Sequence, residues 1–335
     1  MFSHIRRITG ILSVCAPMLM AVPATAETEL SLANFIPPRH PMNAKVFTPL
    51  AEQLAEVTGG ELTIRIFPSG ELGAGPQRQF NRVVTGVADI GFGLQGYTSS
   101  QFPRTLTAEL PGMFSTPSAG VDAIWNDFDL IAGDYAKTKV LAVWVNSSAV
   151  ILTRDRAIEN AEDLSGLTIR APSAIGAKVL EAWGANAVTM PAPEIYNALQ
   201  TGVIDGVFIG AYAVRSFKLD EVTKHAAFGL PNSVTTFFLL MNQASWDGLS
   251  ADEQAQLDSV TGEKLSKHAA EVYTASGAGA RTYLEGLDGY STTILSSDEN
   301  GRMTDMLRDL YGEVAADLGS QGIDGQAIID GLKAH

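Results

Sequence analysis

The sequence predicts a two-lobed α/β protein, and three observations support that fold class. The chain has 335 residues, of which 46% are hydrophobic and 18% charged, so it can bury about two domain cores. Short apolar stretches alternate with segments of helical periodicity, as expected of open α/β sheets. The alternation forms two successive series, the first ending near residue 145 and the second beginning near residue 167. We therefore expect one lobe from each series.

The first series consists of strands separated by helices. Apolar runs and two-residue alternation predict strands at residues 30–33, 62–66, 88–93 and 140–145. Spacings of three and four residues predict helices at residues 46–57 and 77–85. Pro49 lies within the first of these helices. Either the helix kinks there, or its regular part begins there with Thr48 as N-cap.

The second series continues the same alternation. Strands are predicted at residues 167–170 and 206–209, and helices at residues 174–183 and 193–201. After this series, a further strand is predicted at residues 237–242. Ser250 and Glu253 form a capping box that opens a long helix running to about Tyr283. Apolar residues between Met303 and Leu318 share one face of a predicted C-terminal helix.

Residues 1–26 have the pattern of a secretory signal peptide. Arg6 and Arg7 precede a mostly apolar stretch, and Ala24-Thr25-Ala26 is a small-x-small cleavage site. The alternative, a membrane anchor, is disfavoured because the apolar run is interrupted and shorter than the roughly 20 residues of a spanning helix. We expect cleavage after Ala26 and a periplasmic location. The one cysteine, Cys15, would leave with the signal, so the mature chain could form no disulfide.

Charge and motifs exclude several classes of function. Acidic residues outnumber basic ones by 37 to 23, giving a net charge of −14, and such a surface repels nucleic acid. The histidines after residue 26, among them His40, His225 and His268, are far apart in the sequence and form no metal-binding motif. No nucleophile elbow, Walker loop or complete dinucleotide loop occurs. We therefore expect no catalytic site, no metal and no cofactor.

Arg170 is the strongest candidate for a binding residue. It lies at the carboxyl end of the strand predicted at 167–170, where open α/β sheets place their ligands. Its planar guanidinium can hold a carboxylate with two hydrogen bonds, and the amides of the helix beginning near Ala174 would add positive potential. The alternative is an internal ion pair with Glu194 or an aspartate. Position alone leaves both open.

Several segments, taken in order, resemble solute-binding proteins of TRAP transporters, of the dicarboxylate-binding-protein (DctP) type. Each segment is weakly specific alone, but together they cover nearly the whole chain after residue 26. The matching pieces are Leu32-Ala33-Asn34 with Pro38 and His40-Pro41, Thr58–Leu62 with Phe67–Gly73, Gly86–Ile90, Asp163–Leu167 with Ile169-Arg170, and Glu194–Gly202 with Asp205-Gly206.

The resemblance implies a periplasmic-binding-protein-like fold whose two lobes are joined by hinge strands and spanned by one long helix. Residues 27–147 and 236–275 would form lobe I, and residues 148–235 and 276–335 lobe II. The cleft between them would close on a small organic acid. The closed protein would then deliver its ligand to the small and large permease subunits of a TRAP transporter, which an ion gradient drives without ATP.

The resemblance also assigns roles to two residues. Arg170 matches the arginine that holds the ligand carboxylate in this family. Asn242 matches an asparagine near the cleft, although it could equally cap the turn before Trp246.

Two departures from the family pattern bear on the ligand. Sialic acid binders have an arginine where this chain has Val150 and an asparagine within the segment Val207-Phe208-Ile209. Without these polar groups, a polyol or second carboxylate would lack partners, at a cost on the order of 1–3 kcal/mol per unmade bond. We therefore expect a monocarboxylate with an apolar or aromatic body. The candidate contacts, besides Arg170 and Asn242, are Phe35, Tyr97, Trp144, Pro172, Phe208 and Tyr212.

Other functions stay open at this point. The chain could be a ligand-sensing module for a membrane sensor kinase, or bind dicarboxylates or sugar acids within the same family. A binding protein of an ATP-driven importer would share the two-lobe design. A secreted hydrolase or lyase using Arg170 as an anion clamp is disfavoured, because no pair of nucleophile and base is recognisable.

Overall fold

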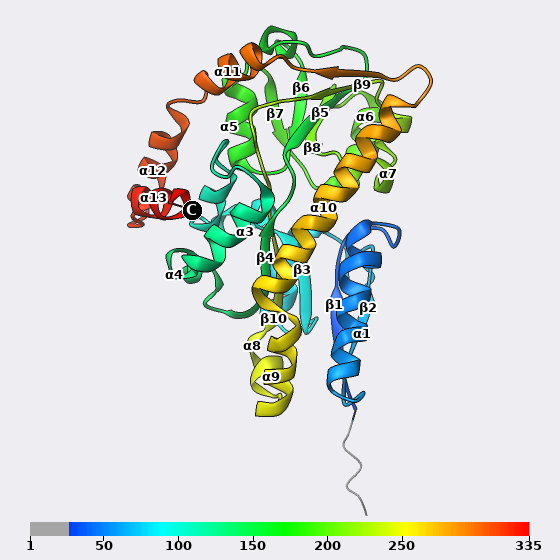
Figure 1. Ribbon diagram of the computed structural model, residues 1–335, viewed down its shortest axis with the longest axis vertical. Coiled ribbons are helices and arrows are strands. Elements are labelled where there is room, and N and C mark those ends of the chain that lie inside the picture. Colours follow the sequence, from blue (N-terminus) through cyan, green and yellow to red (C-terminus); the bar gives the residue numbers. More distant parts are fainter. Residues whose placement is uncertain (1–26, 335) are drawn as a thin grey trace, which may run out of the picture.

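The structure is a computed structural model that describes residues 27–334. The expected signal peptide, its cleavage site after Ala26 and Cys15 therefore lie outside the described residues. Within residues 27–334, no helix is both long enough and apolar enough to cross a membrane. The described chain folds around two β-sheets, one in each half of the molecule (Figure 1).

The first sheet has five strands in the order β2-β1-β3-β10-β4. Its members are β1 (Thr28–Ala33), β2 (Leu62–Phe67), β3 (Ile90–Leu94), β4 (Thr138–Val145) and β10 (Thr236–Asn242). β1 pairs in parallel with β2 and β3, whereas β10 lies antiparallel between β3 and β4. Because β10 comes late in the sequence, the chain must cross into the second half and return to complete this sheet.

The second sheet has six strands in the order β11-β9-β5-β8-β6-β7. Its members are β5 (Ala149–Thr153), β6 (Thr168–Ala171), β7 (Asn186–Thr189), β8 (Gly206–Gly210), β9 (His225–Phe228) and β11 (Ser291–Ile294). β6 pairs in parallel with β7 and β8, as a sheet with helical crossovers requires. Residues 146–148 link β4 to β5, and residues 229–235 lead back from β9 to β10, so these segments join the two halves.

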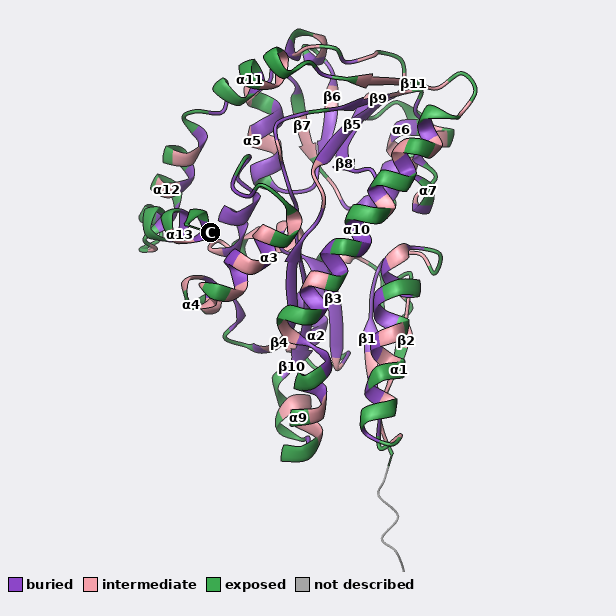
Figure 2. Cartoon of the chain, in the orientation of Figure 1, coloured by how far each residue is buried: buried purple, intermediate pink, exposed green. Residues whose placement is uncertain are grey.

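Helices cover both sheets. Their bounds are α1 (Thr48–Val57), α2 (Gln79–Val84), α3 (Pro117–Asn126), α4 (Phe128–Ile131), α5 (Ala174–Ala182), α6 (Ile195–Thr201), α7 (Ala213–Ser216), α8 (Gln243–Asp247), α9 (Ala251–Val260), α10 (Gly262–Glu285), α11 (Ser297–Asp305), α12 (Leu310–Ser320) and α13 (Gly325–Lys333). Short 3₁₀ segments, among them η4 (Thr105–Glu109), complete the fold. The strands are mostly buried, and the outer helix faces are exposed (Figure 2).

The long helix α10 spans both halves (Figure 1). It packs against β4 and α3 of the first half and against α7 and β11 of the second. Ser266 fixes its position, because its hydroxyl accepts hydrogen bonds from the backbone N–H of Val143 and from Trp125 Nε1, both at 3.1 Å. Near the hinge, a Cβ on Gly277 would lie 3.2 Å from Ser147 Oγ. The two-lobed fold expected from the sequence, with its long spanning helix, is therefore confirmed.

Three helix predictions need correction. The capping box of Ser250 and Glu253 is present, but the helix that it opens ends at Val260, because Thr261 is extended and Gly262 has a φ of +76°. The predicted helix through Met303–Leu318 is divided into α11 and α12. Thr48 is not an N-cap; a π-helical turn, Asn43–Phe47, runs directly into α1, with Pro49 in its first turn.

Four strands of the second sheet were not predicted. One is β5, whose apolar run the prediction missed. The other three, β7, β9 and β11, have four residues each. β7 and β11 are half exposed at the two edges of the sheet, and β9 is half alanine. None of these three has the alternation or apolar run that marks longer strands.

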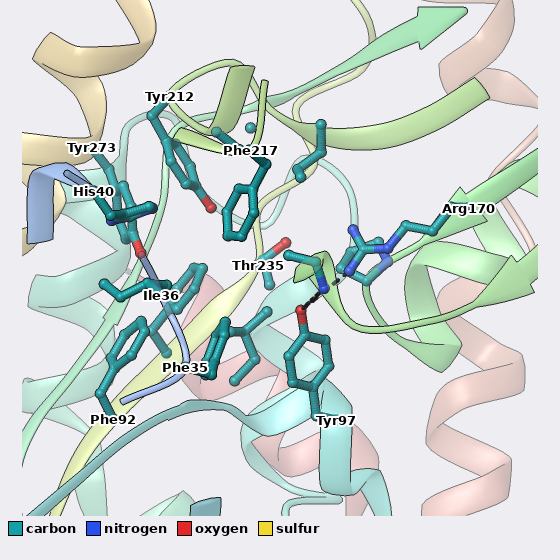
Figure 3. Close-up of a pocket in the computed structure, with 17 residues that line it drawn as sticks. Phe35, Ile36, His40, Phe92, Tyr97, Arg170, Tyr212, Phe217, Thr235 and Tyr273 are labelled. Atoms are coloured by element: carbon teal, nitrogen blue, oxygen red, sulfur yellow. Dashed lines mark hydrogen bonds between the residues drawn. The ribbon is translucent and has the colours of Figure 1, made fainter. Parts of the chain in front are cut away.

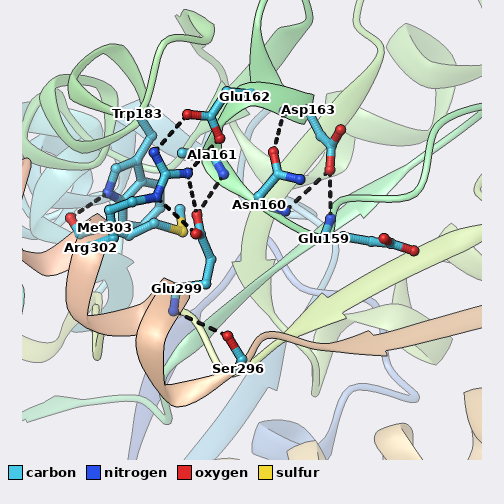
Figure 4. Close-up of polar contacts among 10 residues, drawn as sticks. All are labelled: Glu159, Asn160, Ala161, Glu162, Asp163, Trp183, Ser296, Glu299, Arg302 and Met303. Atoms are coloured by element: carbon cyan, nitrogen blue, oxygen red, sulfur yellow. Dashed lines mark hydrogen bonds and ion pairs between the residues drawn. The ribbon is translucent and has the colours of Figure 1, made fainter.

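The C-terminal arm is fastened to the second half by a polar cluster at the start of α11 (Figure 4). Glu299 Oε1 accepts a 2.8 Å bond from the backbone N–H of Ala161, and Arg302 Nη1 donates to Glu162 Oε1 at 2.6 Å. Trp183 Nε1 also donates to the carbonyl of Met303 at 3.0 Å. Further on, α13 packs against α3 and η4 of the first half. The lobe boundaries given above stay a proposal, because residues 276–334 contact both halves.

We predict that Ser266→Ala lowers the free energy of unfolding by about 2 kcal/mol, because the buried N–H of Val143 loses its partner. Urea unfolding of the purified protein measures this. Ser259→Ala is the matched control, since Ser259 is exposed and bonds only within α9, and it should change stability by less than about 0.5 kcal/mol. Equal effects of the two substitutions would contradict the anchoring role of Ser266.

Candidate ligand-binding site

A cavity lies between the two halves. The first half contributes Phe35, Ile36, His40, Phe92 and Tyr97, the second half Arg170, Pro172, Ile209, Tyr212 and Phe217, the segment before β10 Thr235, and α10 Tyr273. Because both halves and the spanning helix line the cavity, its shape depends on how the halves are set against each other.

Arg170 lies at the end of β6 with 1% of its surface exposed. Nε donates to the carbonyl of Met190 at 2.8 Å, Nη1 to the carbonyl of Phe208 at 3.3 Å, and Nη2 to the hydroxyl of Tyr97 at 3.4 Å. Burial lowers its pKa. No carboxylate in residues 27–334 lies within ion-pair distance of the guanidinium, so the internal ion pair considered above does not form. The buried Glu109 interacts electrostatically with Arg170 but forms no ion pair with it. The guanidinium therefore keeps a place for an anion in direct contact.

Tyr97 adds a hydrogen-bond donor beside this cation. Its hydroxyl oxygen accepts from the backbone N–H of Ala192 at 2.8 Å as well as from Arg170. Burial raises its pKa, so the hydroxyl keeps its proton. Within the described chain no acceptor takes that proton, which leaves it free for a ligand. Thr235 lies near the same end of the cavity (Figure 3).

Aromatic and aliphatic side chains form the walls. Phe35 stacks on Phe92 with ring centroids 5.4 Å apart and an interplanar angle of 17°, and its ring lies 5.7 Å from that of Tyr97. Ile36 and Phe217 also line the cavity, as does Ile209. Such walls suit a flat apolar body.

The end of the cavity opposite Arg170 holds Tyr212, Tyr273 and His40 (Figure 3). The rings of Tyr212 and Tyr273 lie 3.9 Å apart. The hydroxyl of Tyr212 accepts a 3.1 Å bond from Asn146 Nδ2, and Asn146 Oδ1 accepts from the backbone N–H of Thr235 at 2.7 Å. Asn146 therefore ties both hinge segments to this end of the cavity.

His40 is buried, and burial lowers its pKa to about 3. Its Nδ1 accepts a 3.2 Å hydrogen bond from the backbone N–H of Met42. The imidazole is therefore neutral at physiological pH, and Nδ1 is the nitrogen without a proton.

Five of the eight residues predicted to contact a ligand line the cavity: Phe35, Tyr97, Arg170, Pro172 and Tyr212. The side chains of Trp144, Phe208 and Asn242 do not. Trp144 lies behind the wall, stacked on Phe92 and Phe237 at 5.9 and 5.8 Å. Phe208 alternates with Ile209 on β8 and packs edge-on against Trp183 at 5.8 Å, so only its carbonyl serves the site.

Asn242 caps a helix instead of lining the cavity. Its Oδ1 accepts from the backbone N–H of Ser245 at 2.9 Å, and its Nδ2 donates to the carbonyl of Val83 at 2.7 Å. The capping role that the sequence left as an alternative is the one the structure shows.

Several lining residues were not predicted from the sequence, above all His40 and Tyr273. His40 belongs to the His40-Pro41 pair that contributed to the resemblance, but nothing in the sequence showed that its ring faces a cavity. Tyr273 lies on the buried stripe of α10 and could not be told from a core residue. The remaining unpredicted residues are Ile36, Phe92, Leu94, Ala192, Gly210, Ala213, Phe217, Thr235 and Phe237.

Residues 32–317 match the family model DctP, the bacterial extracellular solute-binding proteins of family 7. The chain belongs to this family. The C4-dicarboxylate-binding periplasmic protein DctP of Rhodobacter capsulatus is 25% identical over 334 residues, covering 95% of this chain and 96% of the relative. The family members are transport proteins that capture small organic acids outside the cytoplasm.

Two solved structures have both the fold and appreciable identity. One is a marine metagenome TRAP solute-binding protein specific for aromatic acid ligands, in complex with 3-hydroxybenzoate. It is 31% identical, with a TM-score of 0.89, and the match covers 92% of this chain and 98% of that one. The other is a TRAP solute-binding protein from Rhodoferax ferrireducens with copurified benzoate. It is 27% identical, with a TM-score of 0.87 and coverage of 92% and 97%.

The buried His40 predicts a pH dependence of stability. Its pKa is about 3 in the folded protein and about 6.5 when unfolded, so the unfolded state binds more protons between these values. The contribution of His40 to the free energy of unfolding is therefore fully present above pH 6.5 and is lost as the pH falls. Between pH 7 and pH 5 the free energy of unfolding drops by about 2 kcal/mol.

His40→Asn removes this titration, while its side-chain oxygen can still accept from the N–H of Met42. Urea unfolding at both pH values should show that the variant loses about 2 kcal/mol less than the wild type. His268→Gln, at an exposed position, serves as control and should keep the wild-type slope. An unchanged slope in His40→Asn would contradict the neutral buried imidazole.

Proposed function

We propose that the protein is the periplasmic solute-binding component of a TRAP transporter and captures a monocarboxylate with an apolar or aromatic body. The observation that carries this proposal is the buried guanidinium of Arg170, which has no carboxylate partner in the described chain and faces an aromatic cavity between two lobes. In this proposal, residues 1–26 direct export and the small and large membrane subunits of the transporter receive the ligand. The protein performs no catalysis.

Arg170 has the donors that a carboxylate needs. A guanidinium carries five N–H groups, and three of them are engaged by Met190, Phe208 and Tyr97. One N–H on each terminal nitrogen remains, which allows two charge-assisted hydrogen bonds to a carboxylate. The free hydroxyl proton of Tyr97 supplies a third donor to the same anion.

The rest of the cavity favours an apolar body over a polyol or a second carboxylate. Arg170 is the one cationic side chain among the cavity-lining residues, because the imidazole of His40 is neutral. Ile209 contributes an apolar surface to the wall, and Phe35 offers an aromatic face. The aromatic acids bound by the two similar structures support the same ligand class.

Ligand capture works by closure of the lobes. In this structure Arg39 Nε, on the first half, donates to the carbonyl of Ser216, on the second, at 3.2 Å. The halves also approach closely at Gly96, where a Cβ would lie 2.6 Å from Cβ of Ser173. A ligand that contacts both halves gains most of its binding energy in this arrangement, so it shifts the population towards the closed form. The closed surface is what the membrane subunits would recognise.

A thermal-shift panel tests the proposed ligand class. The purified protein, freed of any copurified ligand, is melted with aromatic acids, aliphatic monocarboxylates, 2-oxo acids, dicarboxylates and sugar acids. A cognate acid at 100 times its dissociation constant stabilises the fold by about 2.7 kcal/mol. We expect aromatic or other apolar monocarboxylates to raise the melting temperature. A response to dicarboxylates or sugar acids alone would contradict the ligand class and leave the binding-protein role in place.

The interlobe bond of Arg39 predicts a kinetic effect. Arg39→Ala removes about 1 kcal/mol from the closed form, so the ligand should dissociate about fivefold faster in stopped-flow measurements. Arg65→Ala is the control, because Arg65 is exposed on β2 and contacts only groups of the same half, the carboxylate of Glu29 and the ring of Phe67. Equal dissociation rates for Arg39→Ala and the wild type would mean that this bond does not hold the lobes together.

A further inference from the structure

His40 presents a buried hydrogen-bond donor to the cavity. Its side chain is 1% exposed, and Nδ1 already accepts the N–H of Met42 at 3.2 Å. Because Nδ1 has no proton, the neutral ring carries its proton on Nε2. In the described chain, Nε2–H has no acceptor. Nε2 is not one of the buried polar atoms without a partner, so it keeps some accessible surface. A ligand atom in the cavity can therefore reach it and accept its proton.

The surroundings of the ring show where that acceptor must come from. The rings of Tyr212, Phe217 and Tyr273 each lie 6.0 Å from the imidazole and enclose it edge-on. All three line the same cavity as His40. The side of the imidazole that these rings leave uncovered therefore faces the cavity, at the end opposite Arg170 (Figure 3).

We propose that His40 is a specificity-determining residue, which selects acids bearing an oxygen acceptor at the end opposite the carboxylate. This inference rests on the proposed function, because Arg170 must first fix the carboxylate end. The ligand class becomes narrower: a flat, mainly apolar monocarboxylate with a hydroxyl, ether or carbonyl oxygen on its far side. A substituent that can only donate hydrogen bonds, such as an ammonium group, would place its donor against the Nε2–H donor. Neither group could accept a hydrogen bond, so such a ligand is rejected.

The neighbouring tyrosines cannot make this distinction. The hydroxyls of Tyr212 and Tyr273 are protonated, because burial raises their pKa values, and a hydroxyl both donates and accepts. They tolerate a substituent of either kind. The imidazole Nε2–H only donates, so the requirement for an acceptor comes from His40.

Calorimetric titration with benzoate, 3-hydroxybenzoate and 4-hydroxybenzoate tests the inference. The wild type should bind at least one hydroxybenzoate about tenfold more tightly than benzoate. His40→Asn is the test variant, because its Oδ1 can accept the N–H of Met42 in place of Nδ1 but it has no group at the position of Nε2. In this variant the ratio of the hydroxybenzoate affinity to the benzoate affinity should fall to within about twofold of one.

His40→Gln is the matched rescue variant, because its Nε2 amide lies the same number of bonds from Cα as the imidazole Nε2. It should recover part of the preference for the hydroxybenzoate. The readout is a ratio of affinities within one variant, so a general loss of folded protein or of cavity shape would not mimic the result.

The outcomes separate the inference from the function on which it rests. If the wild type binds benzoate and both hydroxybenzoates equally, or if His40→Asn keeps the wild-type ratio, the role of His40 is overturned and the proposed function stands. If none of the three acids binds while dicarboxylates or sugar acids do, the proposed ligand class fails and the role of His40 fails with it.

Discussion

The arrangement of the cleft depends on one buried charge, the guanidinium of Arg170. Placing a cation away from water is costly unless an anion accompanies it, and the carboxylates of the described chain leave it unpaired. The protein holds it instead with the carbonyls of Met190 and Phe208 and the hydroxyl of Tyr97. These groups orient the guanidinium without neutralising its charge. In the proposed function, the ligand carboxylate supplies the missing charge, so binding and electrostatic compensation are the same event.

A second set of buried polar groups ties this site to the hinge. Glu109, on η4 of the first half, accepts from Ser173 Oγ at 2.5 Å and from the N–H of Thr236 at 2.8 Å. Ser173 caps α5 directly after the Arg170 strand, and Thr236 begins β10. Asn146 makes the corresponding link between the β4–β5 segment and Tyr212. Both ends of the cavity are thus bonded to the segments that join the two halves. In the proposed function, these bonds couple occupancy of the site to closure.

Most of this architecture can be predicted from the sequence, because strands and helices depend mainly on interactions between residues that are close together in the chain. Apolar runs mark the buried strands, and the carboxyl end of a strand in an open α/β sheet marked Arg170. The predictions that failed concern the direction in which individual side chains point. Strand β8 is apolar throughout, so the sequence does not show whether Phe208 or Ile209 faces the cavity. Tyr273 shares the buried stripe of α10 with core residues, and the break at Thr261 depends on a positive φ at Gly262 within otherwise helical sequence.

The most direct test of this account is the affinity of Arg170→Gln for an apolar monocarboxylate that binds the wild type, measured by calorimetry beside the wild-type protein. Glutamine retains hydrogen-bonding groups but carries no charge. Losing a buried charge partner weakens binding by roughly 2–5 kcal/mol, so we expect the affinity to fall about 30-fold or more. An affinity within threefold of the wild type would show that the guanidinium does not hold the carboxylate and would contradict the central claim.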